Sequence, residues 1–268
     1  MIEHLKTIRD NSFDLSVTSP PYNKRITTRG WLVRDVKYSH SDDAMPEEDY
    51  QRWQIEFLNE MYRVMKPGAS LFYNHKLRWL DGKLHHPFTW ISSTEWNIRQ
   101  EIIWDRGIAA NMRGWRFWQL DERIYWLYKP QKDGDVGKEL LSKHAKMSSI
   151  WRFPPEPRKE NHPAPFPLEL PVRIISSMEL PEGALVFDPF SGTGTSLVAA
   201  KLLGYSYYGI DISPDYVDYT RKRLRRSTQE AQQCKQEVAK HFVKKPFKRR
   251  KEEGQTKWPY RDLSEDAK

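Results

Sequence analysis

Two glycines and two carboxylates in the second half of the chain have the spacing of a nucleoside-binding site. An apolar run ends at Asp188, Gly192 and Gly194 follow it, and a helical apolar pattern comes next. A strand, a glycine turn and a helix in this order place backbone N–H groups and a positive helix end at the turn. Without a Cβ, both glycines would let a ligand approach the main chain. Asp211 ends a second predicted strand over 207–210, where a carboxylate can accept hydrogen bonds from both hydroxyls of a ribose.

Two familiar glycine motifs do not fit this stretch. A phosphate-binding loop needs Gly-Lys-Ser/Thr after its spacer, but Gly194 is followed by Thr195 and Ser196. The dinucleotide fingerprint needs a third glycine or alanine where Leu197 stands. A ligand with a ribose but no pyrophosphate fits better, and S-adenosylmethionine is the common one. The alternative is a glycine turn that only joins a strand to a helix.

The second stretch that could do chemistry is Thr18-Ser19-Pro20-Pro21-Tyr22, which follows a predicted strand over 13–17. The exocyclic amine of a nucleobase is a poor nucleophile because its lone pair is delocalised into the ring. The Ser19 hydroxyl and the Pro20 carbonyl can accept the amine hydrogens, and the prolines fix the backbone without donating a competing N–H. Tyr22 can stack on a base flipped from a duplex. The alternative is an ordinary rigid turn.

Together the two motifs resemble those of the S-adenosylmethionine-dependent amino-methyltransferases of DNA, whose catalytic motif is Asp/Asn/Ser-Pro-Pro-Tyr/Phe/Trp. The catalytic motif precedes the cofactor motif, which resembles the β (circularly permuted) group of that family, over roughly residues 1–226. The resemblance implies an α/β fold with a doubly wound, mostly parallel sheet of the seven-stranded type, circularly permuted. Cofactor and target sites are then expected side by side at the carboxyl ends of the strands.

The resemblance also implies a reaction, the transfer of a methyl group from S-adenosylmethionine to the exocyclic amine of a flipped base. Serine at the first motif position favours cytosine N4, and adenine N6 is the alternative. Methylation of RNA or of protein glutamine uses a related Pro-Pro-Tyr turn, although the basic tail and the motif order disfavour a protein substrate. A DNA-binding pseudoenzyme is the alternative from another class.

Site residues are assigned from the same resemblance. The catalytic turn is assigned Ser19, Pro20, Pro21 and Tyr22, and the cofactor site Thr18, Asp188, Pro189, Phe190, Ser191, Gly192, Gly194, Thr195 and Asp211. His162 joins the cofactor set because the matching family segment wraps the methionine end, although a proline-rich helix entry explains it equally. Family members also carry a cofactor-contacting Gly-Asp pair before the first helix, predicted here over 1–10. Either a preceding segment supplies that acid, or another residue covers the adenine.

Three polar segments, over 23–49, 105–121 and 131–160, are predicted to recognise double-stranded DNA, the first as a closing loop. Arginine can bond guanine or phosphate, and tryptophan can stack or wedge. The net charge of +8 suits a polyanionic partner. Solvated connections are the alternative. The candidate DNA contacts are Arg25, Arg29, Trp31, Arg113, Trp115 and Arg116, and Arg106 lies in the same basic set.

The remaining sequence bounds the organisation of the protein. Residues 1–226 are predicted to form the catalytic domain, with a helix over 46–65 stopped by Pro67-Gly68, and 227–268 a polar helix followed by a disordered basic tail. Cys234 is the single cysteine, which excludes an internal disulfide and a cysteine-based metal cluster. No metal is expected, since a sulfonium is already activated. The absence of a long apolar run favours a cytosolic protein. The resemblance implies the cytosol of a prokaryotic or phage host, and members of this group are often homodimers.

Overall fold

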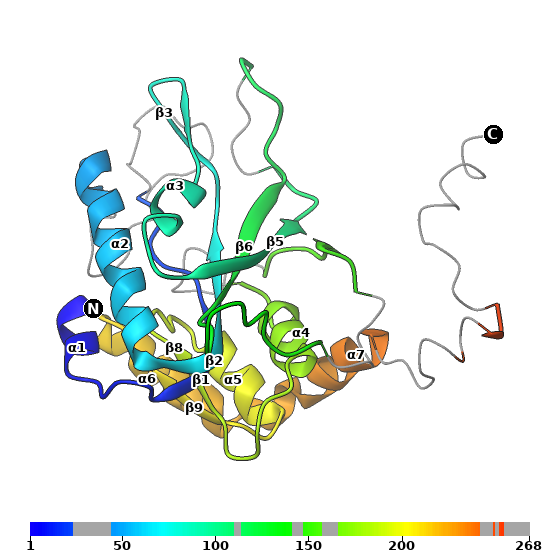
Figure 1. Ribbon diagram of the computed structural model, residues 1–268. Helices are drawn as coiled ribbons and strands as arrows, with labels where there is room; N and C mark the ends of the chain where they lie inside the picture. Colours follow the sequence, from blue (N-terminus) through cyan, green and yellow to red (C-terminus); the bar gives the residue numbers. More distant parts are fainter. Residues whose placement is uncertain are drawn as a thin grey trace, which may run out of the picture.

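The computed structural model describes residues 1–23, 44–109, 114–140, 147–156, 166–241, 249 and 252–254. Its centre is a seven-stranded sheet in the order β7-β5-β6-β2-β1-β8-β9 (Figure 1). β6 is antiparallel to both of its neighbours, and every other neighbouring pair in this sheet is parallel. The expected doubly wound, mostly parallel fold is therefore confirmed. The strands are β1 (Phe13–Thr18), β2 (Met65–His75), β5 (Asn97–Asp105), β6 (Asp121–Tyr128), β7 (Ile150–Arg152), β8 (Leu185–Asp188) and β9 (Ser206–Gly209).

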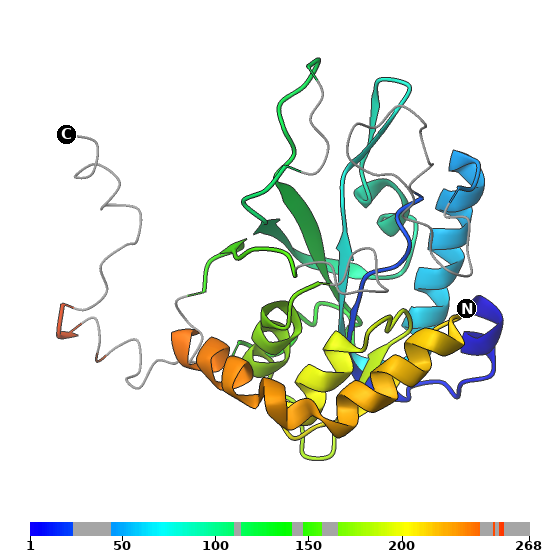
Figure 2. The same cartoon turned by 180° about the vertical axis from the view of Figure 1, so that it is seen from behind.

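Helices cover both faces of this sheet (Figures 1 and 2). One hydrophobic core joins the sheet to α1 (Ile2–Lys6), α2 (Glu47–Val64) and α3 (Phe88–Ile91). The other joins it to α4 (Glu169–Ser177), α5 (Thr195–Leu202) and α7 (Ala231–His241). Between α5 and α7 the chain forms α6 (Pro214–Arg225) and the 3₁₀ turn η2 (Ser227–Glu230).

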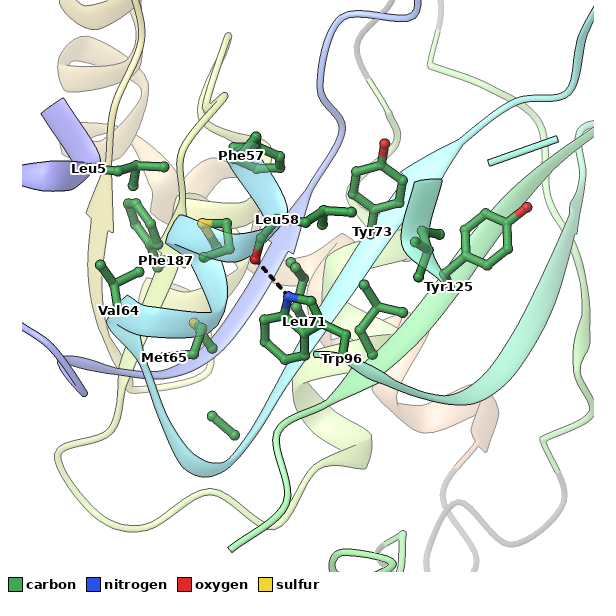
Figure 3. Close-up of a cluster of buried hydrophobic side chains, with 14 of the residues drawn as sticks. Leu5, Phe57, Leu58, Val64, Met65, Leu71, Tyr73, Trp96, Tyr125 and Phe187 are labelled. Atoms are coloured by element: carbon green, nitrogen blue, oxygen red, sulfur yellow. Dashed lines mark hydrogen bonds between the residues drawn. The ribbon is translucent and has the colours of Figure 1, made fainter. Parts of the chain in front are cut away.

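The first core fixes α2 against the middle of the sheet. Phe57 and Leu58 of α2 lie with Leu71 of β2 and Phe187 of β8 in one fully buried cluster (Figure 3). Burying a side chain of this size contributes about 2 to 3 kcal/mol. Trp96 brings a polar atom into the cluster and satisfies it, because its indole N–H donates to the Leu58 carbonyl at 2.8 Å.

The helix predicted over 46–65 is confirmed as α2. It ends at Val64 and β2 begins at Met65, so Pro67 and Gly68 lie inside the following strand. Met65 already pairs with Phe13 of β1, and the Gly68 N–H donates to the Lys129 carbonyl at 2.7 Å. Proline is tolerated near the start of a strand, where its missing N–H removes no essential ladder bond.

The packed part of the chain also extends beyond the predicted boundary at 226. On α7, Cys234 is buried in the second core, and Glu237 is 1% exposed. Arg173 of α4 donates to the Glu237 carboxylate at 2.8 and 2.7 Å, a buried ion pair that ties the two helices together. The polar composition of this helix concealed its packing, because a charged residue, Glu237, is among its buried positions.

Several predictions concern residues outside the described part of the chain. Arg25, Arg29, Trp31, Arg113 and His162 are among them, as are most of the 23–49 segment, the basic run over 244–251 apart from Arg249, and the sequence from 255 onward. Two short stretches of the 131–160 segment, 141–146 and 157–160, lie outside it too. Among the described helices, none has the length and apolar character needed to cross a membrane.

Candidate active site

The two sequence motifs meet at one edge of the sheet. β1 and β8 are parallel neighbours, with Leu15 opposite Val186 and Ser16 opposite Phe187, so their carboxyl ends lie together. The Thr18 hydroxyl at the end of β1 donates to Asp188 Oδ1 at 2.8 Å. This bond links the start of the Ser-Pro-Pro-Tyr turn directly to the start of the glycine turn.

Asp188 is the anchor of the glycine turn. Its carboxylate is completely buried and accepts hydrogen bonds from the Phe190 N–H at 3.0 Å, the Ser196 hydroxyl and Thr18. Burial and, to a smaller extent, the negative charge of Asp211 raise the pKa of Asp188 to about 6, against the lowering effect of the three hydrogen bonds. A carboxylate enclosed in this way shapes the turn, and its direct contact with a cofactor stays a prediction.

The two glycines serve the packing of the turn. Gly194 has φ 76°, and a Cβ there would lie 2.8 Å from Thr220 Oγ1 on α6, with Thr220 Cγ2 closer still. The absent Cβ thus makes room for α6, and the approach of a ligand to the main chain here stays a prediction. Gly192 has φ 47°, and its carbonyl accepts from the Thr220 hydroxyl at 2.9 Å. Its N–H donates to Asp211 Oδ2 at 2.8 Å, so that the turn and the acid form one unit.

Other polar side chains of this turn are likewise satisfied from within. The Ser191 hydroxyl donates to the Ile210 carbonyl at 3.1 Å, and Thr195 Oγ1 accepts from Arg223 at 2.9 Å. Pro189, Ser191 and Thr195 are buried, whereas Phe190 and Asp211 are partly exposed. Among the described residues that were predicted to hold a cofactor, Phe190 and Asp211 are therefore the two at this turn whose side chains are partly exposed.

Asp211 lies two residues beyond Gly209, where β9 ends, and so slightly past the predicted position at the strand end. Its Oδ1 accepts from the Ser213 N–H at 2.9 Å, and Ser213 in turn caps α6. A carboxylate oxygen can accept more than one hydrogen bond, which is the capacity that ribose hydroxyls require. Phe190 and the exposed Ile212 add apolar surface, so the residues present fit a nucleoside.

The catalytic turn is held from both sides. Ser19 Oγ lies 2.6 Å from Tyr22 Oη, and the Pro21 carbonyl accepts from the Tyr50 hydroxyl of α2 at 2.7 Å. Tyr22 is only 6% exposed, and its ring lies 4.7 Å from that of His75. Stacking of Tyr22 on a base therefore stays a prediction, whereas its hydroxyl has a visible structural role.

Three residues that the sequence did not single out for this turn complete it. Asn74 at the end of β2 donates to Tyr22 Oη at 2.7 Å and to Glu122 Oε2 at 2.9 Å. Arg106, which follows β5, donates to Glu122 Oε1 at 3.0 Å. Arg106 belongs to the 105–121 segment that was predicted to recognise DNA, but its own side chain is largely buried in this ion pair. Only the strand order could have indicated these residues. The carboxyl ends of the parallel strands β1 and β2 lie at one edge of the sheet, and the antiparallel strand β6 begins at the same edge.

Exposed aromatic residues lie beside this edge. In the segment between β5 and β6, Trp115 and Trp118 are largely exposed and Phe117 is 99% exposed. The Arg116 guanidinium lies 4.0 Å from the ring of Trp79, in the hairpin of β3 (Arg78–Leu80) and β4 (Lys83–His85). Both views show the hairpin and this segment projecting from the same end of the sheet (Figures 1 and 2). Such surfaces mark interaction sites.

The described residues include no group of three or more His, Cys, Asp or Glu side chains that could hold a metal ion. The hydrogen-bond acceptors of the site indicate what it can bind. These are the Asp211 carboxylate on the nucleoside side and, across the Thr18–Asp188 bond, the oxygens of the Ser-Pro-Pro-Tyr turn. Such an arrangement can bind a nucleoside next to a second molecule that presents N–H donors.

Several curated proteins are similar to the chain in sequence. The type II methyltransferase M.BglII of Bacillus subtilis is 30% identical over 249 residues, which cover 80% of the chain and 64% of the relative. The type II methyltransferase M.HinfI of Haemophilus influenzae is 29% identical over 247 residues, which cover 84% of the chain and 66% of the relative. The chain thus spans just under two thirds of the length of each.

Solved structures share the fold. The cytosine-N4-specific PvuII DNA methyltransferase has a TM-score of 0.64 at 17% identity, with 87% of the chain and 89% of that protein covered. A DNA modification methylase structure from Thermus thermophilus, complexed with S-adenosyl-L-methionine, has a TM-score of 0.58 at 22% identity, with 84% and 90% covered. The family model for the N6/N4 methyltransferases, described as DNA methylase, matches residues 13–222. The chain therefore belongs to the N6/N4 DNA methylase family.

Proposed function

We propose that the chain transfers a methyl group from S-adenosylmethionine to the exocyclic amine of a base flipped out of duplex DNA, at N4 of cytosine. The observation that carries this proposal is the Thr18–Asp188 hydrogen bond of 2.8 Å, which links the turn that can accept amine hydrogens to the turn that can hold a nucleoside. Family membership and relatives named as type II methyltransferases support it.

The cofactor side rests on Asp211, Phe190 and Ile212. The Asp211 carboxylate receives the ribose hydroxyls, and the two apolar side chains flank the adenine. Gly192 and Ser213 hold this carboxylate through their N–H groups before any ligand arrives, which reduces the ordering that binding requires. Bound there, S-adenosylmethionine would supply a methyl group activated by its positively charged sulfur. The sulfur would keep the electron pair of the S–C bond when the methyl group moves to nitrogen.

On the target side, the residues supply acceptors for the amine. The Ser19 hydroxyl and the Pro20 carbonyl accept its hydrogens, which favours a pyramidal nitrogen with an available lone pair. Asn74 Oδ1 supports this reading, since it is buried and has no hydrogen-bond partner among the described residues. A buried acceptor without a partner is unfavourable, and an incoming N–H donor would relieve it.

Contact with DNA is assigned to the exposed segment around Trp115 and Arg116. Arginine can bond phosphate or guanine, and an exposed indole can stack on bases. The net charge of +8 adds a non-specific attraction that weakens as salt rises. Arg25, Arg29, Trp31 and Arg113 lie outside the described residues and stay predicted DNA contacts.

Serine at the first motif position favours cytosine over adenine, and product analysis tests that choice. Plasmid DNA is incubated with the protein and isotope-labelled cofactor, digested to nucleosides and analysed by mass. We expect labelled N4-methylcytosine. Labelled N6-methyladenine as the sole product would overturn the base assignment, and labelled RNA in a competition with unlabelled DNA would overturn the substrate.

A further inference from the structure

The side chains behind Ser19 form a chain of hydrogen bonds that ends at Glu122, and the direction of each bond can be worked out from its donors and acceptors. Ser19, Tyr22, Asn74 and Glu122 come from the catalytic turn, β2 and β6. Tyr22, Asn74 and Glu122 are each at least nine-tenths buried, so their polar atoms depend on one another. Any part that this network plays in methyl transfer rests on the proposed function and adds detail to it.

The orientation of the Asn74 amide is fixed by Glu122. A carboxylate only accepts hydrogen bonds, and the Asn74 atom 2.9 Å from Glu122 Oε2 must therefore be the nitrogen. That nitrogen carries two hydrogens, and its two short contacts are Glu122 and Tyr22 Oη, the latter at 2.7 Å. The third contact, to Ser19 Oγ, is 3.5 Å long and at the limit of a hydrogen bond.

The direction of the Tyr22 bond is set by the same reasoning. Tyr22 Oη lies 3.2 Å from Glu122 Oε2, an atom that can only accept, so the phenolic hydrogen belongs to this contact. The two lone pairs of Tyr22 Oη then accept from Asn74 and from Ser19, whose Oγ is 2.6 Å away. With its own hydrogen committed to Tyr22, Ser19 presents lone pairs only.

We infer that Glu122 is a positioning residue that, through Tyr22, makes the Ser19 hydroxyl an acceptor for the target amine and receives the proton which that amine loses. The amine hydrogen passes as a proton to Ser19 Oγ, the Ser19 proton to Tyr22 Oη and the Tyr22 proton to Glu122 Oε2. Each oxygen on the way gains one proton and gives one up, so Glu122 alone ends in a changed state, as a carboxylic acid.

Arg106 keeps the other side of Glu122 occupied. Its Nη1 donates to Oε1 at 3.0 Å, which leaves Oε2 for Tyr22 and Asn74. The Arg106 N–H also donates to the Leu120 carbonyl at 2.9 Å, so this arginine is held by the same strand pair that carries Glu122. The carboxylate therefore has a fixed orientation with one oxygen directed to the relay.

The test compares Glu122→Gln with a matched control, Glu101→Gln. Glu101 lies on the neighbouring strand β5 and also faces an arginine, Arg123, at 3.5 Å, but it has no contact with the catalytic turn. Single-turnover methyl transfer to DNA should fall about 100-fold in Glu122→Gln and stay unchanged in Glu101→Gln. The dissociation constants for cofactor and DNA should match the wild type in both, since the effect lies in the transfer step.

Tyr22→Phe provides the second arm, because it removes the hydroxyl that joins Ser19 to Glu122. It should lower the rate to a similar extent, and the double variant should lose no more than either single variant. A Glu122→Gln rate within twofold of the control, or additive losses in the double variant, would overturn the inference while leaving the proposed function standing. A wild-type protein that binds cofactor but labels no DNA would instead overturn the proposed function, and the inference with it.

Discussion

The two turns at the edge of the sheet are built in opposite ways. The glycine-turn region, over 185–230, satisfies its polar atoms largely from within: Asp188, Gly192 and Thr195 bond to β1, α5 and α6 residues and are buried. The target-edge region combines Ser19 with side chains from β2, β6 and the end of β5, and it leaves Asn74 Oδ1 without a partner among the described residues. The glycine-turn region is thus a closed platform, whose polar atoms bond to the protein itself. The target-edge region keeps hydrogen-bond acceptors for a substrate.

The comparison teaches where change should affect stability and where it should affect chemistry. Substitutions in the closed platform should disturb packing before they disturb ligand binding, because few of its polar groups face outward. Substitutions at the target edge should lower the rate, because part of its hydrogen-bonding capacity serves a molecule that has yet to bind, and the buried side chains Tyr22, Asn74 and Glu122 also contribute to stability.

Gly194→Ala should break the platform most severely. The backbone there has φ 76°, which costs an alanine about 1 to 2 kcal/mol, and the new Cβ would overlap Thr220 for about 1 to 3 kcal/mol more. We expect the free energy of unfolding to drop by about 3 to 4 kcal/mol in urea titrations. Gly204→Ala is the control, since φ there is 85° but nothing lies within 4 Å of the added Cβ. Equal losses in the two variants would contradict the overlap with Thr220.

The burial of Asp188 in the glycine turn can be tested through the pH dependence of the free energy of unfolding. Its pKa of about 6 in the fold exceeds the ordinary value of 3.8, so between these values the native state holds a proton that the unfolded chain releases. This residue therefore lowers stability as pH rises from about 4 to about 6, by up to about 3 kcal/mol, and has a constant effect above that. Asp188→Asn removes the titration. The variant should gain stability relative to the wild type across that window, and a pH-independent difference would refute the shifted pKa.

Sequence reasoning located the platform well because its parts are contiguous. The apolar run, the glycine turn, the helix and the later acid come one after another along the chain, and the structure brings them together as β8, α5 and Asp211. The sequence did not predict which of these residues are buried. It does not show that Asp188 is enclosed, or that Thr220 occupies the space that a Cβ at Gly194 would need. Both facts depend on how α6 folds back over the turn.

The target edge was only half visible in the sequence for a different reason. Ser-Pro-Pro-Tyr is a local motif, whereas Asn74 and Glu122 become neighbours only because β6 inserts antiparallel between β2 and β5. No local pattern encodes that strand order. The same limit applies to Arg106, whose positive charge resembles that of a DNA contact until its partner on β6 is known.

Asp211→Asn tests whether Asp211, the partly exposed acid of the glycine-turn region, binds the cofactor. The variant keeps the size of the side chain but loses charge and one acceptor for the ribose, which should weaken cofactor binding by about 2 kcal/mol, or roughly 30-fold. Calorimetric titration with S-adenosylmethionine measures this. Asp218→Asn is the control, because Asp218 is an exposed residue of α6 that pairs only weakly with Arg221 at 3.5 Å. Equal affinity in all three proteins would place the ribose elsewhere.

Arg116→Ala should have the smallest effect and is the sharpest test of the DNA surface beside the target edge. The guanidinium lies over Trp79 and is partly exposed, so its loss should change stability little. If it contacts a phosphate, DNA affinity should fall by about 1 kcal/mol, and the slope of log affinity against log salt should decrease by about 1. Arg221→Ala, on the exposed face of α6, removes the same charge away from the target edge and should alter neither quantity. Identical salt slopes in the two variants would mean that net charge, and not this surface, accounts for the attraction.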